Sequence, residues 1–238
     1  MVDAEELDAA RQRQLATNLL ALEERLAAAC RAAGRPRREV ALIAVTKSWP
    51  ARDVRHLAHL GVRDVAENRD QEAADKARSC ADLDLVWHFV GQLQTNKARS
   101  VARYARVVHT VDRPRLVTAL SRGATEHGRS VQALLQVRLD DDPSRGGIEP
   151  AKLGALADLV ERAEGLELAG LMAIAPLGAD AWQAFARLAD VAADLRREHP
   201  QAGWLSAGMS GDMEAAVQHG ATHLRIGTAL LGSRSPLG

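Results

Sequence analysis

The 238-residue sequence has no excess charge of either sign, because 31 Lys and Arg residues balance 31 Asp and Glu residues. Proteins that bind a nucleic-acid backbone need a basic surface, so we do not expect nucleic acid as the main partner. Aromatic residues are also rare, at 3% of the chain, so aliphatic side chains must fill the core. With 47% hydrophobic and 26% charged residues, the composition is nevertheless that of a globular protein.

Cysteines and long hydrophobic runs are scarce as well. Two cysteines, Cys30 and Cys80, cannot form a disulfide framework for a chain of this length. The longest apolar run covers only residues 40–45, far too short for a membrane span, and the acidic N-terminus has no apolar segment typical of a secretory signal. We therefore expect a soluble cytoplasmic protein with no membrane partner.

Short apolar runs alternate with helical stretches along the chain. Four leucines from Leu15 to Leu26 recur at helical spacing and predict a long N-terminal helix, which Gly34 and Pro36 end. The clearest later helix carries apolar residues on one face from Trp182 to Leu195. Eight strands are predicted near residues 40–45, 62–66, 84–90, 106–111, 131–139, 167–174, 204–208 and 222–226.

Strictly alternating strands and helices imply a parallel sheet. Eight such units in a chain of this length are typical of a (β/α)8 TIM barrel, and no linker or change of composition divides the chain. We therefore predict an α/β fold with one domain over residues 1–238, a single (β/α)8 barrel with an additional N-terminal helix. A doubly wound open sheet uses the same βα unit and is the structural alternative.

Lysine is used at only four positions, Lys47, Lys76, Lys97 and Lys152. Lys47 lies two residues beyond the run 40–45, which in either architecture is the ligand-binding end of a strand. An apolar surround there would lower the lysine pKa and favour the neutral amine that attacks a carbonyl. A lysine at a strand end is more often a solvated cation. Arginine cannot form a Schiff base, however, so a lysine retained in this arginine-rich chain suggests amine chemistry.

Two loops of small residues could hold an anion. Ser210 and Gly211 precede a predicted helix, which the Ser210 hydroxyl is expected to cap. Arg225 lies within a predicted apolar strand, where a charge needs a partner, and Gly227 and Thr228 then start a short last helix. These loops follow predicted strands seven and eight, where barrel enzymes commonly bind phosphate. Plain helix capping is the alternative for each loop taken alone.

The histidines give weaker signals. We interpret His88 as a hydrogen-bonded barrel residue rather than a catalytic base. The pairs His56/His59 and His219/His223 have spacings that a metal could use, but neither pair is accompanied by a third ligand. No metal and no catalytic residue are therefore predicted.

Several segments, taken in order, resemble the pyridoxal phosphate homeostasis protein family, whose fold is the alanine-racemase-like barrel. The quoted segments extend from about residue 40 to residue 232 and so cover nearly the whole chain. They are A-V-T-K-S-W-P, A-E-N-R-D-Q-E, W-H-F-V-G-Q-L-Q-T-N-K, V-H-T-V-D-R, G-L-M-A-I-A-P, L-S-A-G-M-S-G-D-M-E-A-A and R-I-G-T-A-L-L-G.

The resemblance implies that Lys47 holds pyridoxal 5′-phosphate (PLP) as a Schiff base. It implies that the loops at Ser210 and Thr228 hold the phosphate, and that Arg225 faces the pyridine nitrogen. An arginine stays protonated and does not give the ring a proton, so the ring is a weak electron sink. The implied cofactor contacts are Lys47, Asn68, Met209, Ser210, Gly211, Arg225, Gly227 and Thr228.

Racemases with this barrel also use a tyrosine, supplied with help from a second domain. The single tyrosine here, Tyr104, is predicted on the helix before strand four, away from the mouth. We therefore predict a monomeric PLP carrier in PLP homeostasis, without efficient catalysis, whose further partners are PLP-dependent apo-enzymes. The alternatives are a PLP-dependent amino-acid racemase and a barrel that binds a phosphate ligand without Schiff-base chemistry, where Lys47 acts only through its charge.

The sequence departs from the family pattern at five positions. Trp49, Arg138 and Arg145 stand where many relatives have lysine, asparagine and lysine, respectively. Ala66 and Arg69 replace a glycine and a tyrosine around the asparagine. The predicted cofactor contacts are intact, but roles in cofactor transfer that depend on accessory lysines are in doubt.

Overall fold

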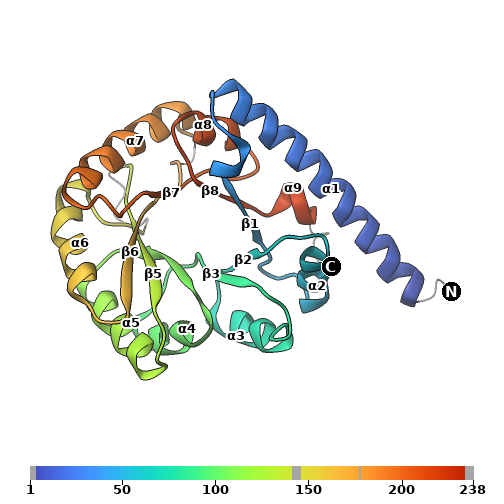
Figure 1. Ribbon diagram of the computed structural model, residues 1–238, viewed down its shortest axis with the longest axis horizontal. Helices are drawn as coiled ribbons and strands as arrows, with labels where there is room; N and C mark the ends of the chain where they lie inside the picture. Colours follow the sequence, from blue (N-terminus) through green and yellow to red (C-terminus); the bar gives the residue numbers. More distant parts are fainter. Residues whose placement is uncertain (1–3, 141–145, 177, 234–238) are drawn as a thin grey trace.

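Eight parallel strands close into a barrel in the order β1 to β8, and the helices surround it (Figure 1). The computed structural model describes residues 4–140, 146–176 and 178–233. The closed strand order confirms the predicted (β/α)8 barrel and excludes the open sheet. The strands are β1 (Ala41–Val45), β2 (Asp64–Glu67), β3 (Val86–Phe89), β4 (Val107–Val111), β5 (Val131–Gln136), β6 (Leu166–Met172), β7 (Trp204–Ser206) and β8 (His223–Ile226).

Each predicted strand is present, within a few residues of its expected bounds. The helices are α1 (Ala4–Ala32), α2 (Ala51–His59), α3 (Asp70–Ser79), α4 (Ala98–Tyr104), α5 (Pro114–Glu126), α6 (Leu153–Arg162), α7 (Ala181–Glu198), α8 (Met213–Gln218) and α9 (Thr228–Leu231), with short 3-10 turns η1 (Arg37–Glu39), η2 (Thr95–Lys97) and η3 (Pro150–Lys152). Trp182 does not lie on the buried face of α7 as expected, since half of it is exposed at the start of the helix.

The main hydrophobic core lies between the strands and the surrounding helices, as strand alternation requires. The interior of the barrel is filled differently. One small apolar cluster there contains Ile43, Val45 and Ala66, and a second is centred on Leu134 and Met172. Buried polar side chains, among them His109 and others described below, occupy the space that aliphatic layers fill in most barrels of this kind.

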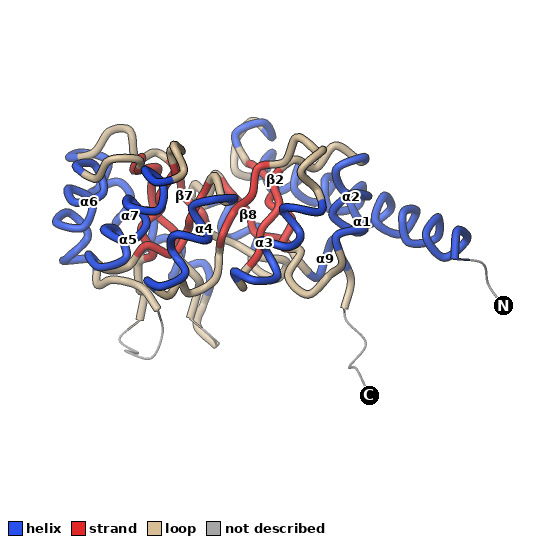
Figure 2. Tube along the Cα trace, turned by 90° about the horizontal axis from the view of Figure 1, so that it is seen from below, coloured by secondary structure: helices blue, strands red, loops and turns tan. Residues whose placement is uncertain are grey.

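The additional helix α1 packs against α8 and α9, the helices that precede and follow β8 (Figure 1). Leu15, Leu22 and Leu26 are buried in this contact, and Asn18 donates from Nδ2 to the Leu230 carbonyl at 2.9 Å. The N-terminal part of α1 extends beyond the barrel (Figure 2). Across the described ranges, no helix combines the length and the hydropathy needed to cross a membrane.

Candidate functional site

The eight predicted cofactor contacts lie at the carboxyl ends of four neighbouring strands, β7, β8, β1 and β2. Strand β1 lies between β8 and β2, with Ile43 paired to Arg225 and Val45 paired to Ala66. The end of this barrel at which the strands finish is the usual position of ligand sites. Residues separated by up to 181 positions in sequence are therefore brought to one half of one rim.

Lys47 is exposed on the turn that follows β1. The backbone closes this turn with a hydrogen bond from Trp49 N to Thr46 O at 3.0 Å, and Ser48 adopts a left-handed conformation with φ of 62°. A left-handed serine is uncommon and needs support from its surroundings. The expectation that Lys47 has an apolar surround is wrong, because its side chain is exposed at the rim.

A buried ionic cluster supports this turn from beneath. Lys76 of α3 is 7% exposed and donates from Nζ to the Thr46 carbonyl at 2.8 Å, to Glu67 Oε1 at 2.7 Å and to Glu72 Oε1 at 2.8 Å. Glu72 Oε1 also accepts from the backbone N–H of Ser48 at 2.5 Å. The residues before and after Lys47 are thus both held by the same cluster.

Glu67 is the fully buried member of this cluster. Its Oε1 accepts from the Thr46 hydroxyl at 2.7 Å as well as from Lys76, whereas Oε2 has no hydrogen-bond partner among the described residues. Burial raises the pKa of Glu67, and the hydrogen bonds from Lys76 and Thr46 oppose that rise. Sequence reasoning missed this cluster. The only signal was the spacing of Glu72 and Lys76, four residues apart on a helix.

Arg225 is a buried cation that has only neutral partners. It is 5% exposed; Nη1 donates to the Ser206 carbonyl at 2.8 Å and to Ser206 Oγ at 2.7 Å, and Nη2 donates to the Ala173 carbonyl at 3.0 Å. Among the described residues, no carboxylate lies at ion-pair distance from it. Burial lowers its pKa to about 10. A buried charge without a counterion favours a ligand that can accept from it.

The loops after β7 and β8 are joined to each other. Ser210 Oγ accepts from the backbone N–H of Ala229 at 3.2 Å, which links the first loop to the start of α9. The predicted capping role of Ser210 is therefore wrong: α8 begins at Met213 after Asp212, and the hydroxyl contacts the neighbouring loop instead. Gly227 does precede α9, as predicted.

Both loop glycines leave room for a ligand to approach the backbone. A Cβ built on Gly211 meets nothing within 4 Å, and one on Gly227 meets only Val45 atoms, at 3.6 and 3.7 Å. Hydroxyls, exposed backbone and a guanidinium form a donor set suited to a phosphate and to an aromatic nitrogen. Met209 lies in the same loop as Gly211 and is 40% exposed.

Asn68 follows β2 and is fixed by close backbone packing. A Cβ on Gly91 would lie only 2.1 Å from the Asn68 carbonyl oxygen, so only glycine permits this approach of the two loops. A cavity of about 620 Å³ opens beside Asn68, with Arg69 and Lys97 among its lining residues. It adjoins the rim at β2 and β3 and includes neither Lys47 nor Arg225.

Comparison with known proteins shows the family of this chain. The model of the alanine racemase N-terminal domain matches residues 17–235. The pyridoxal phosphate homeostasis protein of Mycobacterium tuberculosis is 46% identical over 243 residues, covering 94% of each chain. Its namesake from Escherichia coli K12 is 39% identical over 226 residues, covering 92% of this chain and 97% of the relative. The chain belongs to the pyridoxal phosphate homeostasis protein family.

Several solved structures are similar in fold to this chain. PipY of Synechococcus elongatus PCC7942 without PLP has a TM-score of 0.83 at 40% identity, covering 92% of this chain and all of PipY. The structure of PipY with PLP bound has a TM-score of 0.81. Alanine racemase of Clostridium difficile 630 has a TM-score of 0.73 at 13% identity, which shows a shared fold alone.

Two of the departures from the family pattern have structural partners. Trp49 lies beneath the guanidinium of Arg11, whose carbon is 4.4 Å from the ring centroid, and Arg11 pairs with Asp53 at 2.7 Å. Arg138 donates to Glu149 at 3.2 Å. These contacts tie the two side chains to the fold itself. Arg145, a third departure, lies outside the described residues.

The histidine interpretations are resolved in part. His88 is a hydrogen-bonded residue of the barrel interior, as predicted, with Nδ1 2.9 Å from His109 Nε2. Within the described residues, neither spaced pair belongs to a group of three possible metal ligands: His56 contacts Asp8 alone of the carboxylates, and His219 lies edge-on to Trp182.

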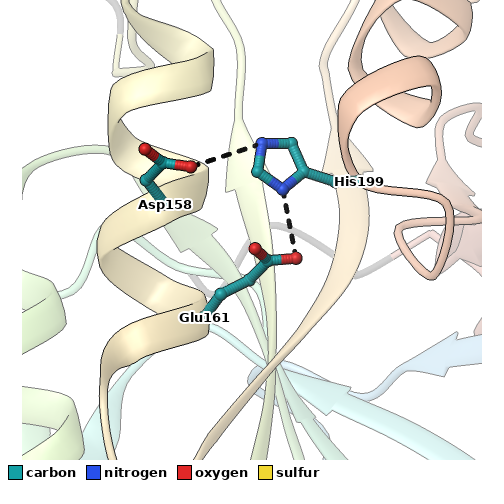
Figure 3. Close-up of side chains that lie close together, drawn as sticks. All are labelled: Asp158, Glu161 and His199. Atoms are coloured by element: carbon teal, nitrogen blue, oxygen red, sulfur yellow. Dashed lines mark ion pairs between the residues drawn. The ribbon is translucent and has the colours of Figure 1, made fainter.

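One other histidine, His199, lies between two carboxylates on the outside of the barrel (Figure 3). Its Nε2 is 3.9 Å from Asp158 and its Nδ1 is 3.1 Å from Glu161, at ion-pair distance although not aligned as a hydrogen bond. Asp158 and Glu161 approach different nitrogens of the His199 ring, so each carboxylate forms its own ion pair with the imidazole when the ring is protonated. A chelated ion would need the ligand atoms to converge on one point. We assign no metal to this cluster.

Proposed function

We propose that this chain binds PLP, with Lys47 forming a Schiff base to it, and that it acts in PLP homeostasis without efficient catalysis. Bound PLP supplies an aldehyde that condenses with an amine, a phosphate dianion and a pyridine ring. One observation carries the proposal. The exposed amine of Lys47 follows β1, and the buried guanidinium of Arg225 lies on β8, the strand next to β1 in the barrel. The PLP-bound structure of a 38% identical relative supports it.

The other predicted contacts have defined tasks in this proposal. Ser210, Gly211, Gly227 and Thr228 offer hydroxyl and backbone donors to the phosphate. Asn68 and Met209 would contact the ring. Arg225 offers an N–H to the pyridine nitrogen and keeps its own proton, because guanidinium is a donor only.

The proposed lack of efficient catalysis rests on the surroundings of the ring. An arginine partner leaves the pyridine unprotonated, which weakens it as an electron sink. The one tyrosine of the sequence, Tyr104, ends α4, and burial raises its pKa further above the range of a useful base. We further propose a cytoplasmic monomer that exchanges PLP with apo-enzymes.

The test is the visible spectrum of the purified protein with added PLP, before and after borohydride, followed by peptide mapping. We expect a yellow protein and a label fixed on Lys47. Lys47→Arg keeps the charge and must lose the fixed label, whereas Lys97→Arg, a matched change of another exposed lysine on the same rim, must keep it. A Lys47→Arg protein that retains the label, or a wild type that never takes up PLP, contradicts the proposal.

Catalysis is tested separately with the PLP-loaded protein. Exchange of the α-hydrogen of amino acids with solvent deuterium is expected to stay near the rate of free PLP. Exchange at an enzymatic rate would establish a racemase-like activity instead. Retained PLP affinity in Lys47→Arg without any Schiff base would indicate a barrel that binds the phosphate alone.

A further inference from the structure

Buried polar side chains form a continuous chain of hydrogen bonds through the interior of the barrel. At one end, Asp64 Oδ1 lies 2.9 Å from His88 Nε2, and His88 Nδ1 lies 2.9 Å from His109 Nε2. His109 Nδ1 lies 2.9 Å from Ser206 Oγ, which in turn accepts from Arg225 Nη1. The contact between His109 on β4 and Ser206 on β7 crosses the interior, because these strands are not neighbours.

The two ends of this series of hydrogen bonds lie at different depths in the barrel. Asp64 is the first residue of β2, and its side chain is 32% exposed, so it reaches solvent on the side where the strands begin. Ser206 is the last residue of β7 and holds the guanidinium at the rim that carries the proposed cofactor site. His88, His109 and Ser206, which connect these ends, are at most 1% exposed.

When both histidines are neutral, these hydrogen bonds can donate in only one direction, from Arg225 toward Asp64. Arg225 can only donate, so Ser206 Oγ accepts from it. The Asp64 carboxylate at the other end can only accept, which requires the Ser206 proton to point toward His109 Nδ1. His109 then carries its proton on Nε2 and donates to His88 Nδ1. His88 in turn carries its proton on Nε2 and donates to the Asp64 carboxylate. In the opposite direction, an unprotonated His88 Nε2 would face the Asp64 carboxylate at 2.9 Å with no proton between them.

Protonation of His88 reverses this direction. The added proton occupies His88 Nδ1, so His109 must move its own proton from Nε2 to Nδ1 and donate to Ser206 Oγ. Ser206 Oγ is then shared between His109 and Arg225 as donors. Burial, together with the charges of His88 and Arg225 and the nearby His223, holds the pKa of His109 well below its usual range, so His109 changes tautomer rather than charge.

We infer that Asp64, His88, His109 and Ser206 are positioning residues for Arg225, forming a relay by which protonation inside the barrel changes the hold on the guanidinium. The groups that face His88 are Asp64, His109 and, through charge, His223; those that face His109 are His88, Ser206, Arg225 and His223. The effect on PLP rests on the proposed function, whereas the relay itself does not.

The relay is tested first without cofactor, by nitrogen NMR of the 15N-histidine protein. At alkaline pH we expect both His88 and His109 to carry the proton on Nε2. On acidification, His109 must carry its proton on Nδ1 in every molecule in which His88 holds a proton on both ring nitrogens. A His109 that is protonated on Nδ1 at alkaline pH, or that keeps its proton on Nε2 when both ring nitrogens of His88 are protonated, overturns the inference.

The link to Arg225 is tested on the PLP-loaded protein through the pH midpoint of its visible absorption. Asp64→Asn should lower that midpoint by about half a pH unit, because an amide accepts the His88 Nε2 proton more weakly than a carboxylate does, which weakens each hydrogen bond along the relay and leaves more of the guanidinium charge to act on the ligand. Asp84→Asn removes an exposed carboxylate on the same side, outside the relay, and should have a much smaller effect.

A double substitution separates the relay from a simple through-space effect of charge. In a Ser206→Ala background, the shift caused by Asp64→Asn should vanish, and Ser206→Thr, which restores the hydroxyl, should bring it back. An equal shift with and without the hydroxyl overturns the inference. If the protein takes up no PLP, the proposed function fails, while the NMR measurement still decides the relay.

Discussion

Two cations are buried near the mouth of this barrel, and they differ in what surrounds them. Lys76, 7% exposed, contacts the carboxylates of Glu67 and Glu72. Arg225, 5% exposed, contacts only neutral oxygens of Ser206 and Ala173. The first charge is balanced within the protein and holds the turn that carries Lys47. The second charge has no counterion among the described residues, which is why we propose it as a ligand contact.

Removing the balanced cation should have the largest effect on stability. Lys76→Met leaves the fully buried Glu67 without its partner, and loss of one member of a buried ion pair costs about 3–5 kcal/mol. Urea unfolding of the cofactor-free protein measures this loss. The double variant Lys76→Met/Glu67→Gln should recover much of it. A loss below about 1 kcal/mol would show that the cluster is not a compensated pair.

The matched change Arg225→Met should cost less, despite equal burial. It leaves neutral acceptors partly unsatisfied, at about 1–3 kcal/mol, while relieving the burial of an uncompensated charge. The net loss in urea unfolding is expected to be less than half that of Lys76→Met. Equal losses for the two variants would remove the distinction between the two sites.

A fall in pH should lower the free energy of unfolding through His223 in the barrel interior. Through Glu67 in the buried ionic cluster, the same fall in pH should raise it. Burial lowers the pKa of His223 to about 4, so between pH 6.5 and 4 the unfolded chain binds a proton there that the folded chain does not. Its contribution to stability, about 3 kcal/mol at most, is lost as the pH falls through that window. Glu67, whose pKa is raised, contributes in the opposite direction.

Urea unfolding at several pH values separates these two contributions. His223→Asn should lose less stability on acidification than the wild type, because the titrating group is gone. Glu67→Gln should lose more, because the folded state no longer gains by taking up a proton at that position. Parallel curves for all three proteins would contradict the assignment.

The smallest effect is expected for a cation paired at the surface. Arg25 contacts Glu214 at 2.5 Å and also donates to the Ser210 carbonyl at 2.8 Å, but about 40% of its side chain is exposed. Exposed pairs of this kind contribute about 0–1 kcal/mol. Arg25→Gln should therefore change the free energy of unfolding by less than about 1 kcal/mol, and high salt should remove most of the difference.

The predictable part of the site consists of residues whose placement follows from strand ends. Lys47 and Arg225 were found because each is tied to a short apolar run, and the ends of parallel strands meet at one rim. The hold on Lys47 could not be predicted. It needs Thr46, Glu67 and Lys76 from three different elements, and nothing in their spacing shows that the side chains converge.

The sequence by itself determined the eight alternating units, the candidate nucleophile and the family, because these depend on local pattern and on contiguous motifs. Only the tertiary structure decided which charges are balanced. Closing the barrel brings Ser206 to His109, 97 positions away in the chain, and sets Arg225 among neutral oxygens. Such partners depend on which side chains the closed sheet turns inward, and a linear pattern of apolar residues does not specify how the few polar ones meet there.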